Sequence, residues 1–395
     1  MELMEFELGN PQEDTPPKRI QRKRHKKKLK WLAIISLLVL VGVVFAVLSD
    51  SAAFDGLRRN MIYARAEKDD TGCARLYQYA EEQNRCFASV GGSLITASLG
   101  QMQVLGEDGT VRYTTGLKFH EAAVSTAGNR AAVYDIGGTE IYILDAQGLV
   151  HSIICEGTIF TANLNEKGYL AVTANKSGYK AAVYVYAPDG EMVFEFDSSE
   201  RFVMTASVSD NGRQMAAVTM GQSDGTFVSN VVIYKLSSDT PRASCDLSGD
   251  AVYQLGMLKG KYCALAEDAL YLISDDGSLT SYDYSEEFLR RCSFSDGGYA
   301  ALLLDTYKSG TQGRLVTVDG NGKEIASLET DSDVLSLSAA GRYIALLSSD
   351  HLTIYNKNLK EVATLTDVST AKQALMRRDG STVLVGNDAA SLYLP

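Results

Sequence analysis

The chain has 395 residues, of which 45% are hydrophobic and 22% are charged, with six prolines and 34 glycines. These values are ordinary for a globular protein and exclude collagen-like, proline-rich and disordered chains. Residues 1–30 contain nine Lys/Arg and five Asp/Glu, so the rest of the chain carries 29 basic and 44 acidic residues, a net charge of −15. Direct nucleic-acid binding requires a basic surface. An acidic body of this size therefore argues against nucleic acid as a partner.

The N-terminal segment predicts a membrane anchor. Residues 31–48 are uncharged and mostly apolar, and as a helix they would span about 27 Å, close to the thickness of the hydrocarbon core. Nine Lys/Arg precede this run, and the next ones are Arg58 and Arg59. The positive-inside rule then places residues 1–30 in the cytoplasm and the chain from about residue 49 outside. A cleaved signal peptide ending near Ser51 is the alternative, although its apolar region is usually shorter.

From residue 86 onward the chain repeats one pattern, in which a glycine stands just before an apolar, Ala-rich run. In six copies a Ser or Asn precedes the glycine by three positions. The eight glycines are Gly92, Gly128, Gly168, Gly212, Gly260, Gly298, Gly341 and Gly380, with a mean spacing of about 41 residues. Glycine supplies the positive φ of a tight hairpin without a steric cost. Each unit therefore predicts a hairpin followed by further short strands.

The strands of these units are apolar on both faces, as in residues 170–172 and 183–186, so both faces are expected to be buried. Units of this length with several strands are typical of β-propeller blades. The sequence thus predicts an all-β, eight-bladed propeller after a single N-terminal transmembrane helix, with seven blades and a parallel β-helix as alternatives. The last unit is one strand short, and Cys73–Tyr79 has the length and pattern to supply it. Such a closure would join the two ends of the ring.

The chain divides on this basis into four predicted parts. Residues 1–30 form a cytoplasmic basic tail, and residues 31–48 form the transmembrane helix. A juxtamembrane linker covers residues 49–72, and the propeller covers residues 73–395.

The blade pattern looks like those of the WD40 and quinoprotein superfamilies, but it lacks their tryptophans, because Trp31 is the only one in the chain. A second resemblance covers nearly the whole sequence. The basic segment and anchor, and the stretches 57–59, 85–92, 177–186 and 209–213, resemble an uncharacterised bacterial family of single-pass membrane proteins with an extracytoplasmic propeller. This resemblance implies a location in the bacterial cell membrane and no particular activity.

The chain holds no catalytic motif in the context that its chemistry needs. Gly221-Gln222-Ser223-Asp224-Gly225 fits the G-x-S-x-G pattern of a hydrolase, but that turn works above an α/β sheet. A flexible loop is the prediction here. The histidines outside the tail, His120, His151 and His351, lack zinc-site spacing. The sequence therefore predicts no catalytic residue, no metal and no cofactor.

All six cysteines follow the anchor, and an exported domain permits disulfides. Six cysteines allow fifteen pairings, which spacing alone does not resolve. Cys73 and Cys86 flank the proposed ring closure, and they are the best candidate pair.

Loop length indicates where a partner would bind. The connections between the second and third strands at Asn175–Lys180, Met220–Asn230 and Tyr307–Gly313 are long, and in a propeller they share one face. The candidate binding residues on them are Lys176, Tyr179, Lys180, Gln222, Phe227, Tyr307, Lys308 and Gln312. Harmless variation of loop length is the competing interpretation.

Two functions are compatible with the sequence. The favoured one is a non-catalytic, membrane-anchored binding or scaffolding module for an envelope protein or a cell-wall component. The alternative is a small-ligand sensor or an enzyme that uses the central channel of the propeller.

Overall fold

The computed structural model describes residues 30–42, 56, 59, 61, 63, 69–70, 72–82, 84–223, 225–247, 249–307, 312–330 and 333–395. It has two compact units, residues 1–64 and residues 65–395. In the first unit, residues 30–42 form a helix with exposed side chains, and the remainder of the predicted membrane span, residues 43–48, lies outside the described residues. No helix in the described residues is both long enough and apolar enough to cross a membrane.

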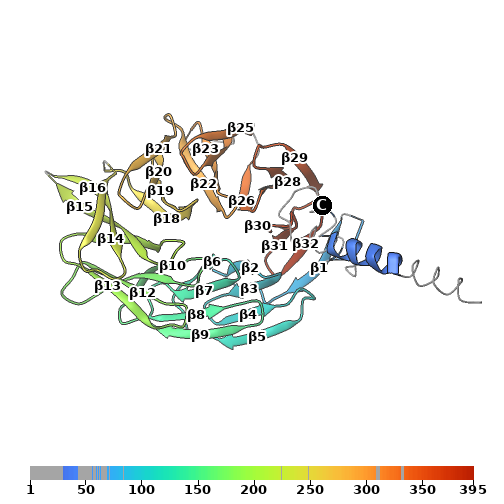
Figure 1. Cartoon of the computed structure of the whole chain (residues 1–395), viewed down its shortest axis with the longest axis horizontal. Coiled ribbons are helices and arrows are strands. Elements are labelled where there is room, and N and C mark those ends of the chain that lie inside the picture. Colours follow the sequence, from blue (N-terminus) through green and yellow to red (C-terminus); the bar gives the residue numbers. More distant parts are fainter. Residues whose placement is uncertain are drawn as a thin grey trace, which may run out of the picture. The chain divides into compact units, whose positions relative to one another are not determined.

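The second unit folds into eight four-stranded antiparallel sheets, so the prediction of an eight-bladed propeller is confirmed and the seven-bladed alternative is wrong. Figure 1 follows these blades around a ring. Blade 1 contains β2 (Cys86–Val90), β3 (Ser93–Ala97), β4 (Gln101–Leu105) and β5 (Val111–Gly116). Blade 2 contains β6 (Ala122–Ala127), β7 (Arg130–Asp135), β8 (Glu140–Leu144) and β9 (Leu149–Ile154). Blade 3 contains β10 (Ile159–Leu164), β11 (Leu170–Ala174), β12 (Ala181–Tyr186) and β13 (Met192–Ser198).

The chain continues around the ring in the same way. Blade 4 contains β14 (Phe202–Val208), β15 (Gln214–Ser223), β16 (Thr226–Lys235) and β17 (Pro241–Asp246). Blade 5 contains β18 (Val252–Leu258), β19 (Lys261–Ala266), β20 (Ala269–Ile273) and β21 (Leu279–Asp283). Blade 6 contains β22 (Phe288–Ser295), β23 (Tyr299–Asp305), β24 (Gly313–Asp319) and β25 (Glu324–Thr330). Blade 7 contains β26 (Val334–Ala340), β27 (Tyr343–Ser348), β28 (His351–Asn356) and β29 (Glu361–Thr366).

Blade 8 closes the ring with strands from both ends of the propeller. It combines β30 (Gln373–Met376), β31 (Thr382–Val385) and β32 (Ala389–Tyr393) with β1 (Cys73–Gln78). The strand order is β1-β32-β31-β30, and β1 pairs antiparallel with β32, from Cys73 opposite Tyr393 to Gln78 opposite Ala389. Figure 1 shows β1 beside β32. The predicted closure by Cys73–Tyr79 is therefore confirmed over residues 73–78.

The repeated glycines have the backbone conformation that the sequence predicted. All eight lie in the turn between the first and second strands of their blades, and every one has a positive φ, from +55° at Gly341 to +88° at Gly168. An L side chain is strained in this region of φ. Glycine therefore allows the chain to reverse direction within a few residues between the first and second strands of each blade.

The core lies between neighbouring blades. One cluster joins Ile95 and Val104 of blade 1 to Val133 of blade 2, and another joins Leu272 of blade 5 to Leu302 of blade 6. Strands such as β3, β11 and β12 are buried at every position. The predicted burial of both sheet faces is confirmed.

Antiparallel connectivity gives the propeller two different faces. The turns between first and second strands, and those between third and fourth strands, lie on one face, named here the turn face. The connections between second and third strands lie on the opposite face, together with the links between blades, and this is named the loop face. The inner strand of each blade begins at the loop face.

Candidate functional site

Exposed aromatic side chains are gathered on the loop face. In the described part of the propeller, seven Phe and Tyr residues are exposed, by 37% to 64%. Four of them are the first or second residue of an inner strand, and three lie in or beside a connection between second and third strands. In chain order they are Phe160, Tyr179, Phe202, Phe227, Tyr253, Phe288 and Tyr307. All seven belong to the loop face, and they are named here the aromatic set.

The predicted loop of blade 3 lies between β11 and β12 and is held by charge pairs. Lys176 Nζ lies 2.7 Å from Asp197 Oδ2 and 2.5 Å from Glu195 Oε1. Hydrogen bonds to these carboxylates raise the pKa of Lys176. The same ammonium lies 5.3 Å from the ring centroid of Tyr179, a cation–π distance. Because Lys176 is already neutralised by two carboxylates, it supports Tyr179 rather than offering a free charge to a partner.

Lys180 belongs to the same loop and contacts the next blade. Its Nζ lies 5.3 Å from the ring centroid of Phe202, the first residue of β14. The structure thus brings the predicted Lys180 close to Phe202.

In blade 4 the predicted long loop, Met220–Asn230, is wrong. Strands β15 and β16 extend through this segment and pair as far as Ser223 opposite Thr226. Gly225 has a φ of +82°. The Gly, Ser and Asn residues suggested a loop, but the ladder hydrogen bonds decide the conformation. The G-x-S-x-G pattern accordingly lies at the tip of a β-hairpin, not in a flexible loop. Gln222 and Phe227 face each other across this hairpin.

In blade 6 the connection after β23 carries Tyr307, which is 62% exposed. Gln312 is exposed at its other end, and Lys308 lies outside the described residues. The predicted binding residues that the structure describes thus all belong to the loop face, in blades 3, 4 and 6. Blade 5 lies between the predicted residues of blade 6 and those of blades 3 and 4.

Sequence reasoning missed four members of the aromatic set: Phe160, Phe202, Tyr253 and Phe288. Each lies at the start of an inner strand, where the neighbouring units usually have a small or aliphatic residue. They lie 7 to 10 residues before the turn glycines of their units, so an aromatic residue in that window was the signal available in the sequence.

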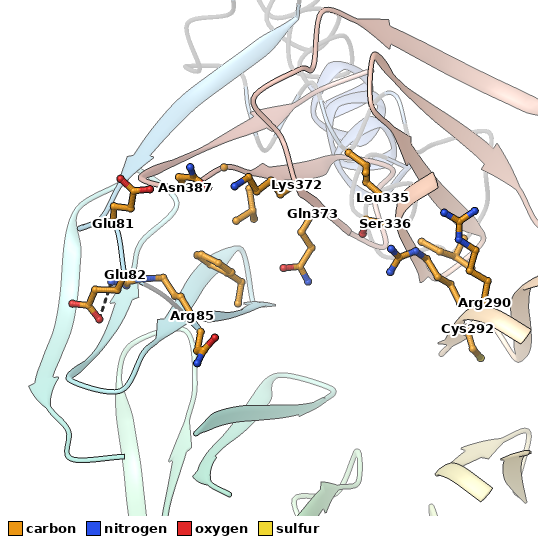
Figure 2. A pocket seen from close by; sticks show the side chains of 16 residues that line it. Glu81, Glu82, Arg85, Arg290, Cys292, Leu335, Ser336, Lys372, Gln373 and Asn387 are labelled. Atoms are coloured by element: carbon orange, nitrogen blue, oxygen red, sulfur yellow. Dashed lines mark ion pairs between the residues drawn. The ribbon is translucent and has the colours of Figure 1, made fainter. Parts of the chain in front are cut away.

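A cavity of about 860 Å³ lies on the loop face, at the mouth of the central channel. It is lined by the beginnings of β2, β22, β26 and β30, so blades 1, 6, 7 and 8 contribute to it. Figure 2 shows Arg85 and Arg290 on opposite sides of this cavity, with Lys372 and Gln373 between them. We name it the channel-mouth cavity.

Arg290 is the best-paired cation of the channel-mouth cavity. Its guanidinium lies 2.9 Å from Asp333 Oδ1 and 3.6 Å from Asp305 Oδ2. Burial raises the pKa of Asp305, and the neighbouring Arg290 partly opposes this effect. Arg290 therefore connects the first strand of blade 6 to the end of β23 and to the link before β26.

The thiols are unsuited to nucleophilic chemistry. Burial is the largest cause of a raised pKa at five of the six cysteines, to about 11 at Cys86. A cysteine with a raised pKa is held as the unreactive thiol. All six are free in the structure, so the predicted disulfide between Cys73 and Cys86 is not formed in it. Cys73 pairs within blade 8, whereas Cys86 begins the inner strand of blade 1.

The three histidines outside the tail do not form a metal site with the other described residues. Nδ1 of His120 lies 2.9 Å from Asp135 Oδ2, and the buried Asp135 also accepts the backbone N–H of Glu121. This arrangement orders the link between blades 1 and 2. Within the described residues, no three His, Cys, Asp or Glu side chains are grouped so that they could hold a metal ion.

Residues 70–388 match the model of a family of unknown function, DUF5711, and the chain belongs to that family. The fold is similar to that of solved propellers. These include the C-terminal WD40 domain of Sif2, with 10% identity, a TM-score of 0.58, and coverage of 81% of this chain and 98% of that one. The Dos1 propeller has 11% identity, a TM-score of 0.54, and coverage of 81% and 94%. BamB from Moraxella catarrhalis has 12% identity, a TM-score of 0.50, and coverage of 80% and 99%.

Identities at this level show the fold alone. A search of curated protein sequences found no match to this chain.

Proposed function

We propose that this member of the DUF5711 family is a non-catalytic binding module. Its propeller is held outside the bacterial cell membrane by a single N-terminal anchor, and its loop face binds an envelope protein. The observation that carries the proposal is the position of the aromatic set, all of which belongs to one of the two propeller faces.

Exposed aromatic rings on one face are an unfavourable arrangement for a propeller without a partner, because apolar surface in contact with water is costly. Tyr and Phe are enriched at the centres of protein interfaces, where a few such side chains supply most of the binding energy. Two rings of the aromatic set, Tyr179 and Phe202, are flanked by lysines that lie 5.3 Å from the ring centroids. These contacts reduce the rotational freedom that the rings would lose on binding.

The test replaces Tyr179, Phe227 and Tyr307 together by Ala. All three are well exposed, so the substitution should change the free energy of unfolding by less than about 1 kcal/mol. We expect this triple substitution to abolish the crosslinks between the chain and its partner proteins in intact cells. The matched control replaces three exposed apolar residues of the outermost strands, Leu149, Met192 and Leu279, by Ala.

Equal loss of partners in both variants, or retention in both, would contradict the proposal. Crosslinks to wall glycan instead of protein, lost only in the aromatic variant, would assign the same face to a cell-wall component.

A further inference from the structure

The channel-mouth cavity is more basic than the acidic body around it. Four cations line it, Arg85, Arg290, Arg291 and Lys372, against the two carboxylates of Glu81 and Glu82. Three neutral amides, from Asn84, Gln373 and Asn387, add hydrogen-bond donors. Its volume, about 860 Å³, lies within the usual range for small-molecule sites.

Two of the four cations have no carboxylate partner among the described residues. Arg290 is neutralised by Asp305 and Asp333, whereas Arg291 donates from Nε to the carbonyl of Val334 at 3.3 Å and forms no ion pair with a described residue. Lys372 is exposed, and its ammonium likewise has no ion pair in the described structure. Partial burial and the adjacent Arg290 lower the pKa of Arg291, and the carboxylate of Asp333 partly opposes this effect. An anion in the cavity would relieve this repulsion.

Arg85 provides an independent observation on the opposite side of the cavity. Its side chain is only 3% exposed, with Nη2 3.5 Å from Glu82 Oε2 and Nη1 3.0 Å from Thr96 Oγ1. The guanidinium lies over the ring of Tyr79, 5.4 Å from the centroid. Nε is buried without a hydrogen-bond acceptor, and Nη2 has only the long contact with Glu82, so the guanidinium is incompletely paired.

We propose that the channel-mouth cavity binds a small oxyanion, a molecule with carboxylate or phosphate groups, through Arg291 and Lys372, with Arg85 on the opposite side. Guanidinium groups suit this chemistry because their N–H donors match the paired oxygens of a carboxylate or phosphate. Figure 2 shows Arg85 and Arg290 at opposite sides of the cavity. This site is separate from the aromatic set and does not rest on the proposed function.

The test is calorimetric titration of the full chain, purified in a non-ionic detergent, with citrate, with pyrophosphate and with neutral erythritol. We expect one of the two anions to bind with a Kd below about 1 mM, more weakly as the salt concentration rises, and erythritol not to bind. Preference for citrate identifies a carboxylate ligand, and preference for pyrophosphate identifies a phosphate ligand.

Arg291→Gln and Lys372→Gln should each weaken binding about tenfold or more, as expected for the loss of a charged hydrogen bond. Both residues are exposed, so neither variant should unfold. The control is Arg213→Gln, an exposed arginine in a turn-face hairpin, which removes the same charge and should bind as the wild type does. Absence of binding by both anions, or equal affinity in all three variants, overturns the proposal. The triple aromatic variant should bind the anion normally, so the two proposals can fail independently.

Discussion

At the scale of single residues, the repeated Ser-x-x-Gly pattern serves two purposes. The glycine allows the hairpin, as described above. In some copies the serine also joins neighbouring blades: Ser125 Oγ accepts the backbone N–H of Leu164 at 3.0 Å, and Ser338 Oγ accepts that of Met376 at 3.0 Å. These bonds satisfy polar groups on the inner strands that have no further strand to pair with. The sequence showed the repeated serine and glycine. It did not show the hydrogen bonds between blades, because these join residues of different units.

The last unit has Arg377 where most others have Ser, and the ring closure explains this. Arg377 is buried, and it donates from Nε to Ser89 Oγ at 2.9 Å and from Nη2 to the carbonyl of Gly92 at 3.0 Å. It therefore connects blade 8 to the turn of blade 1. We expect Arg377→Ala to lower the free energy of unfolding by about 2–3 kcal/mol, because buried hydrogen bonds to a charged group are lost. Thermal unfolding followed by circular dichroism measures this effect.

Arg242→Ala is the control for this prediction. Arg242 forms a partly exposed ion pair with Asp275, and such pairs contribute about 1 kcal/mol or less. Melting temperatures lowered equally by the two substitutions would mean that Arg377 does not stabilise the closure.

At the scale of elements, the sequence predicted the repeated units and the closure of the ring, but it missed one hairpin and the channel-mouth cavity. Eight hairpins, eight blades and the strand exchange in blade 8 follow from a glycine spacing and a missing strand. The long loop predicted between β15 and β16 was wrong. Its Gly and Ser residues suggested a loop, but the two strands pair with each other through this segment. The channel-mouth cavity was not predictable, since Arg85, Arg291 and Lys372 are far apart in the chain and only closure of the ring brings them to one cavity.

Closure predicts that β1 supports the whole propeller and not only blade 8. Deleting residues 70–80 removes the outer strand of that blade and exposes the edge of β32, and it also removes Tyr77, which is fully buried. We expect a single unfolding transition that is shifted to lower temperature, measured by circular dichroism. Deletion of residues 2–12, of equal length and outside the propeller, is the control. An unchanged melting temperature after the first deletion, or the loss of only a small fraction of the signal, would show that the ring does not depend on β1.

At the scale of the whole molecule, charge is divided between the two parts of the chain. The first 30 residues have a net charge of +4, and the remainder has a net charge of −15. A basic segment beside an apolar run resists export, and clustered lysines and arginines are attracted to the anionic lipids of the cytoplasmic leaflet. The acidic remainder has no such attraction. The excess of Lys/Arg before the apolar run is the basis for the proposal that the propeller lies outside the cell membrane.

The proposed topology predicts different protease sensitivity for the two ends of the chain. With one tag at the N-terminus and another at the C-terminus, protease added to intact, wall-stripped cells should remove the C-terminal tag and spare the N-terminal one. Permeabilised cells, in which both tags become accessible, control for tags that are resistant to the protease. The membrane fraction of untreated cells should contain both tags on one chain, because the proposed topology retains the anchor. A C-terminal tag released into the medium would indicate a cleaved signal peptide instead. Protection of the C-terminal tag in intact cells would place the propeller in the cytoplasm, and the partner would then have to be sought there.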